Sequence, residues 1–169
     1  MNQTSSRKLD PHLQLIGGLY LVLEAIRKEG HMSVDKDAEN PRASKKFSAL
    51  GDYDIANEPV YLFVCDVLKF MLVGHLNANE TDKYMLAYRR TTKLNDEQES
   101  MFEVARLTLL ASLEGYRPAV AIEIGRQGIP AGIKPSSSEL EEFIDAMKNR
   151  DKASVEIRLN NFFDSIEAP

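Results

Sequence analysis

The side chains that could carry out chemistry are few in this sequence, and their spacing does not bring them together. The three histidines, His12, His31 and His75, are scattered and match neither HExxH nor another metal-ligand spacing. No glycine-rich loop is followed by Lys-Ser or Lys-Thr, so no phosphate-binding loop is predicted. Cys65 lies in an apolar stretch, where a lone cysteine is more often a small buried hydrophobe than a nucleophile. We therefore predict no metal site, no cofactor and no catalytic residue.

One acid, Glu123, stands out because its neighbours are apolar. Arg126 follows three residues later, a spacing at which opposite charges meet on a helix. An ion pair between these two side chains is favoured over a catalytic acid, and an enzymatic interpretation would depend on Glu123 alone. The serine run at 136–138 precedes a glutamate-rich segment, a pattern typical of a helix start rather than of a nucleophile.

The stretch 107–126 is the one against which we expect the other helices to pack. Two apolar helical runs meet there, separated by Gly115, Tyr116, Arg117 and Pro118. Glycine readily leaves a helix in the left-handed conformation, and proline is well tolerated in the first turn of the next helix. We predict two helices joined at a fixed bend.

Helical periodicity runs through most of the chain, and no convincing strand pattern occurs. Pro59 suits the first turn of the most apolar helix, and Gly30 and Gly74 are predicted helix ends. Other helices are expected over residues 11–29, 42–50, 58–74, 77–90, 96–114 and 153–166, with one more after the serine run. The predicted fold class is all-α, a compact bundle of about six to eight helices. Residues 1–10 are predicted to be a flexible leader, and 11–169 a single helical domain.

Size and charge exclude several classes of function. The chain has 169 residues, which suits one domain, and its net charge of −5 argues against a nucleic-acid partner. A membrane-spanning helix needs roughly 20 mostly apolar residues. The best candidates, 13–26 and 59–76, are both interrupted by charged residues. The single cysteine suits a reducing compartment. We predict a soluble cytoplasmic protein, or one peripheral to the inner membrane, that does not insert into the bilayer.

Two blocks of the sequence carry a specific resemblance. Residues 13–80 contain IRKEGHMSVDKDAENPRASKKF and VYLFVCDVLKFMLVGHLNANE, and residues 102–149 contain VARLTLLASLEGYRPAVAIEIGRQ and SELEEFIDAMKN. Their order and content resemble the cytoplasmic parts of the MotA family, the flagellar stator subunits related to TolQ and ExbB. The motif residues expected to have structural roles are Pro41, Pro59, Gly115, Tyr116, Pro118, Glu123 and Arg126.

The chain also departs from the family. The family has two membrane helices before the first block and two more between the blocks, whereas the segment from Glu80 to Phe102 is only about two dozen residues long and rich in charge. A membrane hairpin needs roughly 40 apolar residues. We therefore expect a stator-like cytoplasmic domain that does not conduct ions and is a monomer or weak dimer.

The resemblance further implies a charged contact surface. In the family, an arginine at the end of the first long helix and an acid a few residues beyond it face opposite charges on the rotor protein FliG. The matching residues here are Arg27 and Asp35, with Asp in place of the usual Glu. The neighbouring charges that enlarge this patch are Lys36, Asp37 and Glu39.

Plainer interpretations remain open for this patch. A cation in the last turn of a helix is stabilised by the helix dipole alone, by about 0.3–1 kcal/mol. A run of charges is also commonly just a solvated face. The leading hypothesis is a non-enzymatic domain that binds a FliG-like rotor protein. The alternative is a soluble adaptor or scaffold in a secretion, conjugation or other cell-envelope complex.

Overall fold

The structure of the protein is a computed structural model that describes residues 10–74 and 77–149. Within these ranges the chain forms seven α-helices and no strand, which confirms the all-α prediction. The α-helices are α1 (Pro11–Glu29), α2 (Asp35–Glu39), α3 (Glu58–Val73), α4 (Ala78–Thr91), α5 (Asp96–Leu113), α6 (Pro118–Arg126) and α7 (Ser137–Lys148). Three short 3-10 turns connect them: η1 (His31–Val34), η2 (Pro41–Ala43) and η3 (Ile55–Asn57).

Side chains at the helix starts explain most of the helix bounds. The helices α4, α5 and α7 each begin with a reciprocal capping box, formed by Asn77 with Glu80, Asn95 with Gln98, and Ser136 with Glu139. In each box the first side chain accepts a hydrogen bond from the third helical N–H, and the second side chain accepts one from the cap N–H. The predicted capping roles of Asn95 and of the serine run are therefore confirmed.

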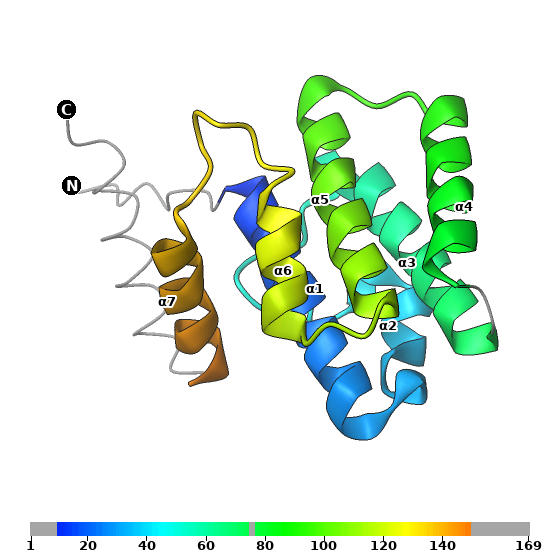
Figure 1. Cartoon of the computed structure of the whole chain (residues 1–169), viewed down its shortest axis with the longest axis horizontal. Coiled ribbons are helices and arrows are strands. Elements are labelled where there is room, and N and C mark those ends of the chain that lie inside the picture. Colours follow the sequence, from blue (N-terminus) through cyan, green and yellow to red (C-terminus); the bar gives the residue numbers. More distant parts are fainter. Residues whose placement is uncertain (1–9, 75–76, 150–169) are drawn as a thin grey trace.

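The helix α1 lies at the centre of the bundle and is largely buried. In Figure 1, α7 lies at one edge of the molecule and α4 at the other, with α6 and α5 between them. Gly17 and Gly18 allow close packing on α1, because an added Cβ would come within 2.7 Å of Leu50 and of Phe47, respectively. Each glycine lowers the helix propensity by about 1 kcal/mol relative to alanine, but its lack of a side chain permits this close packing.

The predicted bend joins α5 and α6 as antiparallel neighbours (Figure 1). Gly115 has a φ of 92°, in the region that favours glycine, and Pro118 occupies the first turn of α6. The two helices approach very closely at Gly125, where an added Cβ would lie 1.9 Å from Thr108 Oγ1. The bend is therefore set by the local backbone conformation at Gly115 and Pro118. The absence of a side chain at Gly125 lets α6 pack closely against α5.

Two sequence predictions need correction. Residues 42–50 do not form a helix: η2 ends at Ala43, and turns follow to Leu50. The charged stretch after Gly30, for which no helix was predicted, contains η1 and α2. Short helices of this kind have too few residues to show a periodic pattern, and packing rather than propensity stabilises them. The helix predicted at 153–166 lies outside the described residues.

The membrane prediction can be compared with the helices directly. Among the helices of the described ranges, none combines the length and the apolar character that crossing a bilayer requires. The longest, α1, has 19 residues.

Candidate partner-binding surface

Arg27 lies in the last turn of α1, three residues before the helix ends at Gly30. Its guanidinium donates to both carboxylate oxygens of Glu24, at 3.2 Å from Nε and 3.1 Å from an NH2 nitrogen. Lys28 Nζ lies 3.0 Å from the same carboxylate. The Arg27 and Lys28 side chains are 53% and 61% exposed, but that of Glu24 is only 16% exposed. Two exposed cations therefore share one acid, and the exposed Glu29, the last residue of the helix, adds a second negative charge at the same helix end.

The protonation behaviour of this group follows from the hydrogen bonds. The hydrogen bond from Arg27 lowers the pKa of Glu24, and the bond from Lys28 acts in the same direction against the effect of burial. The hydrogen bond to Glu24 also raises the pKa of Arg27. Both groups are therefore charged at neutral pH.

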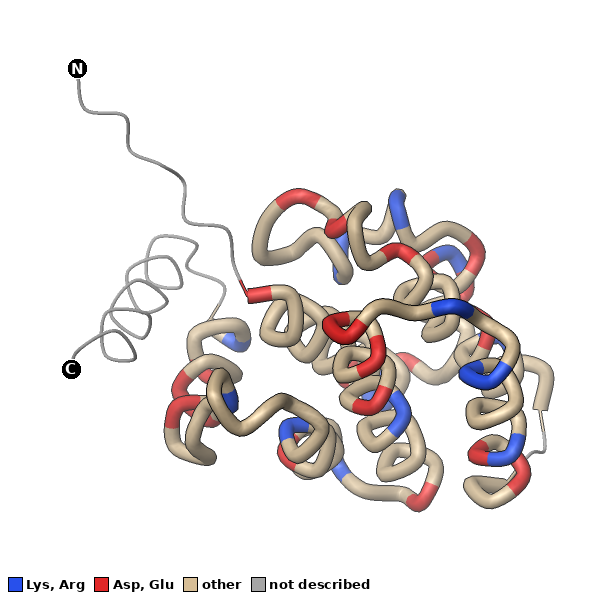
Figure 2. The backbone as a smooth tube through the Cα atoms, turned by 90° about the horizontal axis from the view of Figure 1, so that it is seen from above, with Lys and Arg blue, Asp and Glu red and all other residues tan. Residues whose placement is uncertain are grey.

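Asp35 provides the acidic side of the surface. The chain turns at Gly30, where φ is 87°, passes through η1 and begins α2 at Asp35. Asp35 is half-buried, whereas Lys36 and Glu39 are exposed. None of these three forms an ion pair with another residue in the described part of the chain. Both signs of charge are thus available to a partner around the α1–α2 connection, as they are over much of the molecule (Figure 2).

Asp37 does not belong to this exposed surface, contrary to the prediction from the charge run. It is only 7% exposed. Its carboxylate accepts hydrogen bonds from the Ser44 hydroxyl and from Lys46 Nζ, both at 2.6 Å. Its backbone carbonyl accepts a 3.4 Å hydrogen bond from the Cys65 thiol on α3. Asp37 therefore fixes the inner side of α2 to the following loop and to α3.

The residues that follow α2 hold it in place. Asn40 accepts a hydrogen bond from the backbone N–H of Arg42, and Pro41 is buried in η2. Arg42 donates to both oxygens of Glu58 at the start of α3, at 2.5 and 2.7 Å. Pro59 follows in the first turn of that helix, and its carbonyl accepts a hydrogen bond from Tyr88. The ENPR motif is thus a structural support for the surface, with Pro41 and Pro59 in the roles predicted for them.

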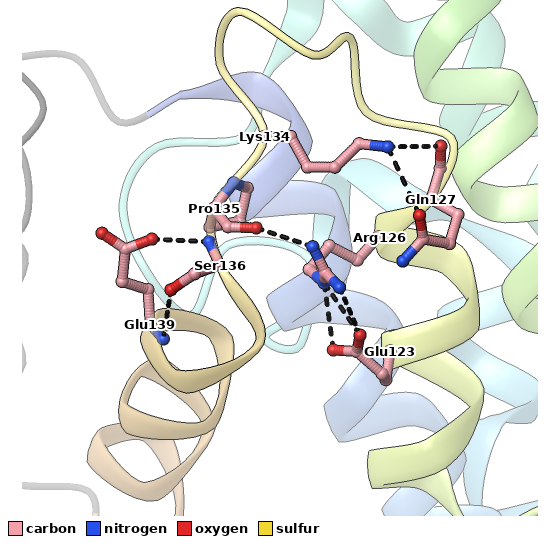
Figure 3. A network of polar contacts seen from close by, with 7 residues as sticks. All are labelled: Glu123, Arg126, Gln127, Lys134, Pro135, Ser136 and Glu139. Carbon is pink, nitrogen blue, oxygen red and sulfur yellow. Dashed lines mark hydrogen bonds and ion pairs between the residues drawn. The ribbon is translucent and has the colours of Figure 1, made fainter.

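Glu123 and Arg126 form the predicted ion pair on α6, in the network that Figure 3 shows. Arg126 donates to Glu123 through Nε at 3.0 Å and through an NH2 nitrogen at 2.5 Å. Its other terminal nitrogen donates to the Pro135 carbonyl at 2.8 Å. Lys134 donates to the Gln127 carbonyl at 3.1 Å, which closes the same loop. The pair therefore connects α6 to the loop that leads to α7.

The described histidines and the cysteine lie on three different elements, His12 on α1, His31 in η1 and Cys65 on α3. Within residues 10–74 and 77–149, no group of three or more His, Cys, Asp or Glu side chains could hold a metal ion. His12 is buried between Asp10 and Ser100, its Nε2 lying 2.7 Å from the serine hydroxyl. Cys65 is buried, and its removal from water raises the pKa of its thiol to about 12. His31 is exposed at the start of η1, and His75 lies outside the described residues.

Comparison with curated proteins finds relatives of low identity that match most of this chain. The chain is 23% identical to motility protein A of Escherichia coli (strain K12) in an alignment 212 residues long, gaps included, which covers 82% of this chain and 72% of the relative. The motility protein A of Salmonella typhimurium is 21% identical over the same extent. The chain is MotA-like. No protein-family model and no solved structure matches it.

The matched region contains a difference in length. It extends over 212 residues, more than the 169 residues of the whole chain. The relatives therefore have residues inside the matched region that have no counterpart here.

Proposed function

We propose that this MotA-like chain is a non-enzymatic protein-interaction domain that engages a FliG-like rotor protein through the charged surface around Arg27 and Asp35. The single observation that supports it best is the sharing of Glu24 by Arg27 and Lys28. Two exposed cations therefore stand at the end of α1, a few residues before Asp35, which forms no ion pair with another residue of the described ranges. Such an arrangement suits a partner that presents both signs of charge.

The energetics of the surface fit a contact that must form and break repeatedly. An exposed ion pair contributes only about 0–1 kcal/mol. Such charges steer the approach of a partner more than they hold it, and salt screens them over a distance of about 10 Å at 0.1 M. The charged surface therefore gives fast, salt-dependent association.

We further propose that the chain does not conduct ions, since the segment from Glu80 to Phe102 is too short and too charged for a membrane hairpin. Any ion pathway would belong to other segments or to other subunits. In this proposal the domain binds the rotor protein and does not drive it.

The test is the affinity of the purified chain for the C-terminal domain of a FliG-like protein from the same organism, measured by biolayer interferometry at 50 and 300 mM NaCl. The charge reversal Arg27→Glu is expected to weaken binding about tenfold at low salt and to reduce the salt dependence. The control is Arg90→Glu, an exposed arginine on α4. Equal affinities of the wild type and Arg27→Glu would refute the charge contact. Failure of the wild type to bind, with capture of a secretion-complex protein instead, would favour an adaptor role.

A further inference from the structure

The outer face of α3 carries four side chains that reach solvent along one stripe of the helix: Leu62, Asp66, Lys69 and Val73. Leu62 is 45% exposed and Val73 is 86% exposed. The side chains of Asp66 and Lys69 are 43% and 50% exposed. At 3.6 residues per turn, all four lie within about 60° of arc around the helix axis. Most of the other α3 side chains are buried, and the helix packs against α2, α4 and α5.

The spacing of this α3 stripe is the same in both directions along the helix. Four residues separate Leu62 from Asp66, three separate Asp66 from Lys69, and four separate Lys69 from Val73. A 4-3-4 spacing is that of the residues through which two helices pack side by side in a left-handed pair. An apolar residue stands at each end of the stripe, and one charge of each sign lies in the middle. Reversing the helix therefore exchanges only the two charges.

A second copy of the chain is complementary to such a stripe. When two α3 helices lie antiparallel about a two-fold axis midway along the stripe, Leu62 lies opposite Val73 of the partner subunit, and Asp66 lies opposite the partner subunit's Lys69. Two-fold symmetry makes each of these contacts twice. The pairing therefore consists of two central ion pairs with an apolar contact on either side.

The charges of the α3 stripe disfavour the parallel orientation. In a parallel pair each of the two charged side chains would face its own copy, so that acid meets acid and base meets base. Within one chain, Lys69 Nζ lies 3.5 Å from the Asp66 carboxylate, which is longer than a usual hydrogen bond. The internal contact is therefore loose, and both charges can turn to a second copy.

Phe70 adds apolar surface beside the stripe. Its ring packs edge-on against that of Tyr84 on α4, with centroids 4.4 Å apart and 72° between the ring planes. The ring of Phe70 is still 39% exposed. Because this packing already restricts the ring, covering it costs little conformational entropy.

The size of the stripe sets the strength of the pairing. A helix of 16 residues is about 24 Å long and, with its side chains, about 10 Å wide. Such a strip is smaller than the roughly 800 Å² per partner that a stable complex buries. A charged pair at the centre of a helix interface also fixes orientation at a cost in affinity. The expected dimer is therefore weak.

We infer that the chain forms a weak antiparallel dimer through the α3 stripe, with Asp66 and Lys69 of each copy fixing the register. A lipid surface matches the stripe less well, because anionic headgroups favour basic charge alone. The inference does not depend on the proposed rotor binding, since that surface lies around Arg27 and Asp35 and this one lies on α3.

The experiment is sedimentation velocity of the full chain from about 10 µM to about 1 mM in 50 mM NaCl. The average mass should rise with concentration from 19.0 kDa toward twice that value. Asp66→Lys and Lys69→Asp should each weaken self-association at least about tenfold, because like charges then face each other. Val73→Ser should also weaken it, by about fivefold or more, through loss of apolar contact.

The decisive measurement is an equimolar mixture of Asp66→Lys and Lys69→Asp. In the antiparallel pair, the introduced lysine faces the introduced aspartate, and the two native charges also face each other. The mixture should therefore associate about as strongly as the wild type. The double variant, with both substitutions in one chain, should likewise associate with itself. Only a folded variant can restore association, so the rescue also excludes misfolding as the cause of the loss.

The matched controls lie on other helices. Asp145 and Lys148 on α7 have the same three-residue spacing and side chains of similar exposure, so Asp145→Lys should self-associate within about twofold of the wild type. Val120→Ser on α6 is the control for Val73→Ser, since Val120 is also exposed.

Each contrary outcome overturns the inference. A wild type that remains a monomer up to 1 mM refutes the dimer, and the stripe would then be free for another protein. Single charge variants that associate like the wild type refute the central ion pairs. A mixture that stays monomeric while both variants are folded refutes the antiparallel register. Equal losses for Asp145→Lys and Asp66→Lys would show an effect of net charge alone.

Discussion

Asp37 and Lys46 form an ion pair at 2.6 Å that directs one acid of the charged stretch into the interior. Two residues earlier on the same short helix, Asp35 makes no ion pair with another described residue. Their sequence neighbourhoods are nearly identical, but their surroundings differ. One carboxylate therefore stabilises the fold, and the other is available to a partner.

Replacing Asp37 should therefore destabilise the protein, and replacing Asp35 should not. Asp37→Ala leaves Lys46 and the Ser44 hydroxyl without their acceptor, at a cost of about 2–3 kcal/mol in the free energy of unfolding. The cost is below that of a fully buried pair because the Lys46 side chain is 26% exposed. Asp35→Ala should change the free energy by less than about 1 kcal/mol. Urea unfolding measures the free energy of unfolding of each variant. Equal losses for Asp37→Ala and Asp35→Ala would contradict the distinction between a structural Asp37 and an exposed Asp35.

The close contact of α5 and α6 predicts that Gly125 cannot be replaced even by alanine. Alanine has the higher helix propensity, by about 1 kcal/mol. Its Cβ would, however, lie 1.9 Å from Thr108 Oγ1 and 3.0 Å from the Val104 carbonyl oxygen. Overpacking of this kind costs about 3 kcal/mol, so the steric effect should dominate.

The control for this prediction is Gly132→Ala, because an added Cβ there meets no atom within 4 Å. In a double-mutant cycle, Thr108→Ala should recover part of the loss caused by Gly125→Ala. Thermal unfolding provides the measurement. A Gly125→Ala variant as stable as the wild type would mean that the helices are not packed this closely.

Cys65 should be nearly inert in the folded protein. Burial raises the pKa of its thiol to about 12, so at pH 8 the thiolate fraction is about a thousand times smaller than that of an ordinary cysteine. The reaction with a thiol reagent such as DTNB should be slower by about that factor than in 6 M guanidinium chloride. Similar rates under the two conditions would place Cys65 at an accessible site.

Asp10 caps α1 and should make stability depend on pH in a defined direction. Burial by itself would raise the pKa of Asp10, but hydrogen bonds from the His12 ring and from the Leu13 and His12 backbone outweigh it and hold the pKa below its ordinary value. The cap therefore stabilises fully above the unfolded-state pKa and is lost as the pH falls through the folded-state pKa.

At pH 7, Asp10→Ala should lower the free energy of unfolding by about 1 kcal/mol, and the difference from the wild type should narrow on acidification. Asp52→Ala is the control, since Asp52 is exposed. Unfolding by urea at a series of pH values gives the comparison. A difference that widens toward low pH would contradict the sign of the shift.

The sequence predicts the long helices of this fold well because their signals are local. The bounds of α1 can be predicted from the spacing of its apolar residues and from Gly30 at its end. The α5–α6 bend can be predicted from the presence of a glycine and a proline at positions 115 and 118. The Glu123–Arg126 pair likewise follows from a three-residue spacing. Each of these features depends on residues within one or two helical turns of one another.

The proposed partner-binding surface is harder to predict from the sequence, because its composition depends on which side chains are buried. The sequence alone gives no reason to distinguish Asp37 from the other charged residues of this stretch, Asp35, Lys36 and Glu39. Its burial becomes visible only in the structure, where its carboxylate accepts hydrogen bonds from Ser44 and Lys46. The exposure of Tyr116 is likewise not predictable from the sequence, since an aromatic residue between two apolar runs is expected to lie in the core. Tertiary contacts determine both outcomes.

The most direct test of the account is the position of the surface that a FliG-like C-terminal domain touches. In a titration of the 15N-labelled chain monitored by NMR, we expect the largest amide shift changes at residues 27–36. Amides of the Ile133 loop should stay unchanged. Changes concentrated on α4, with residues 27–36 unaffected, would contradict the account.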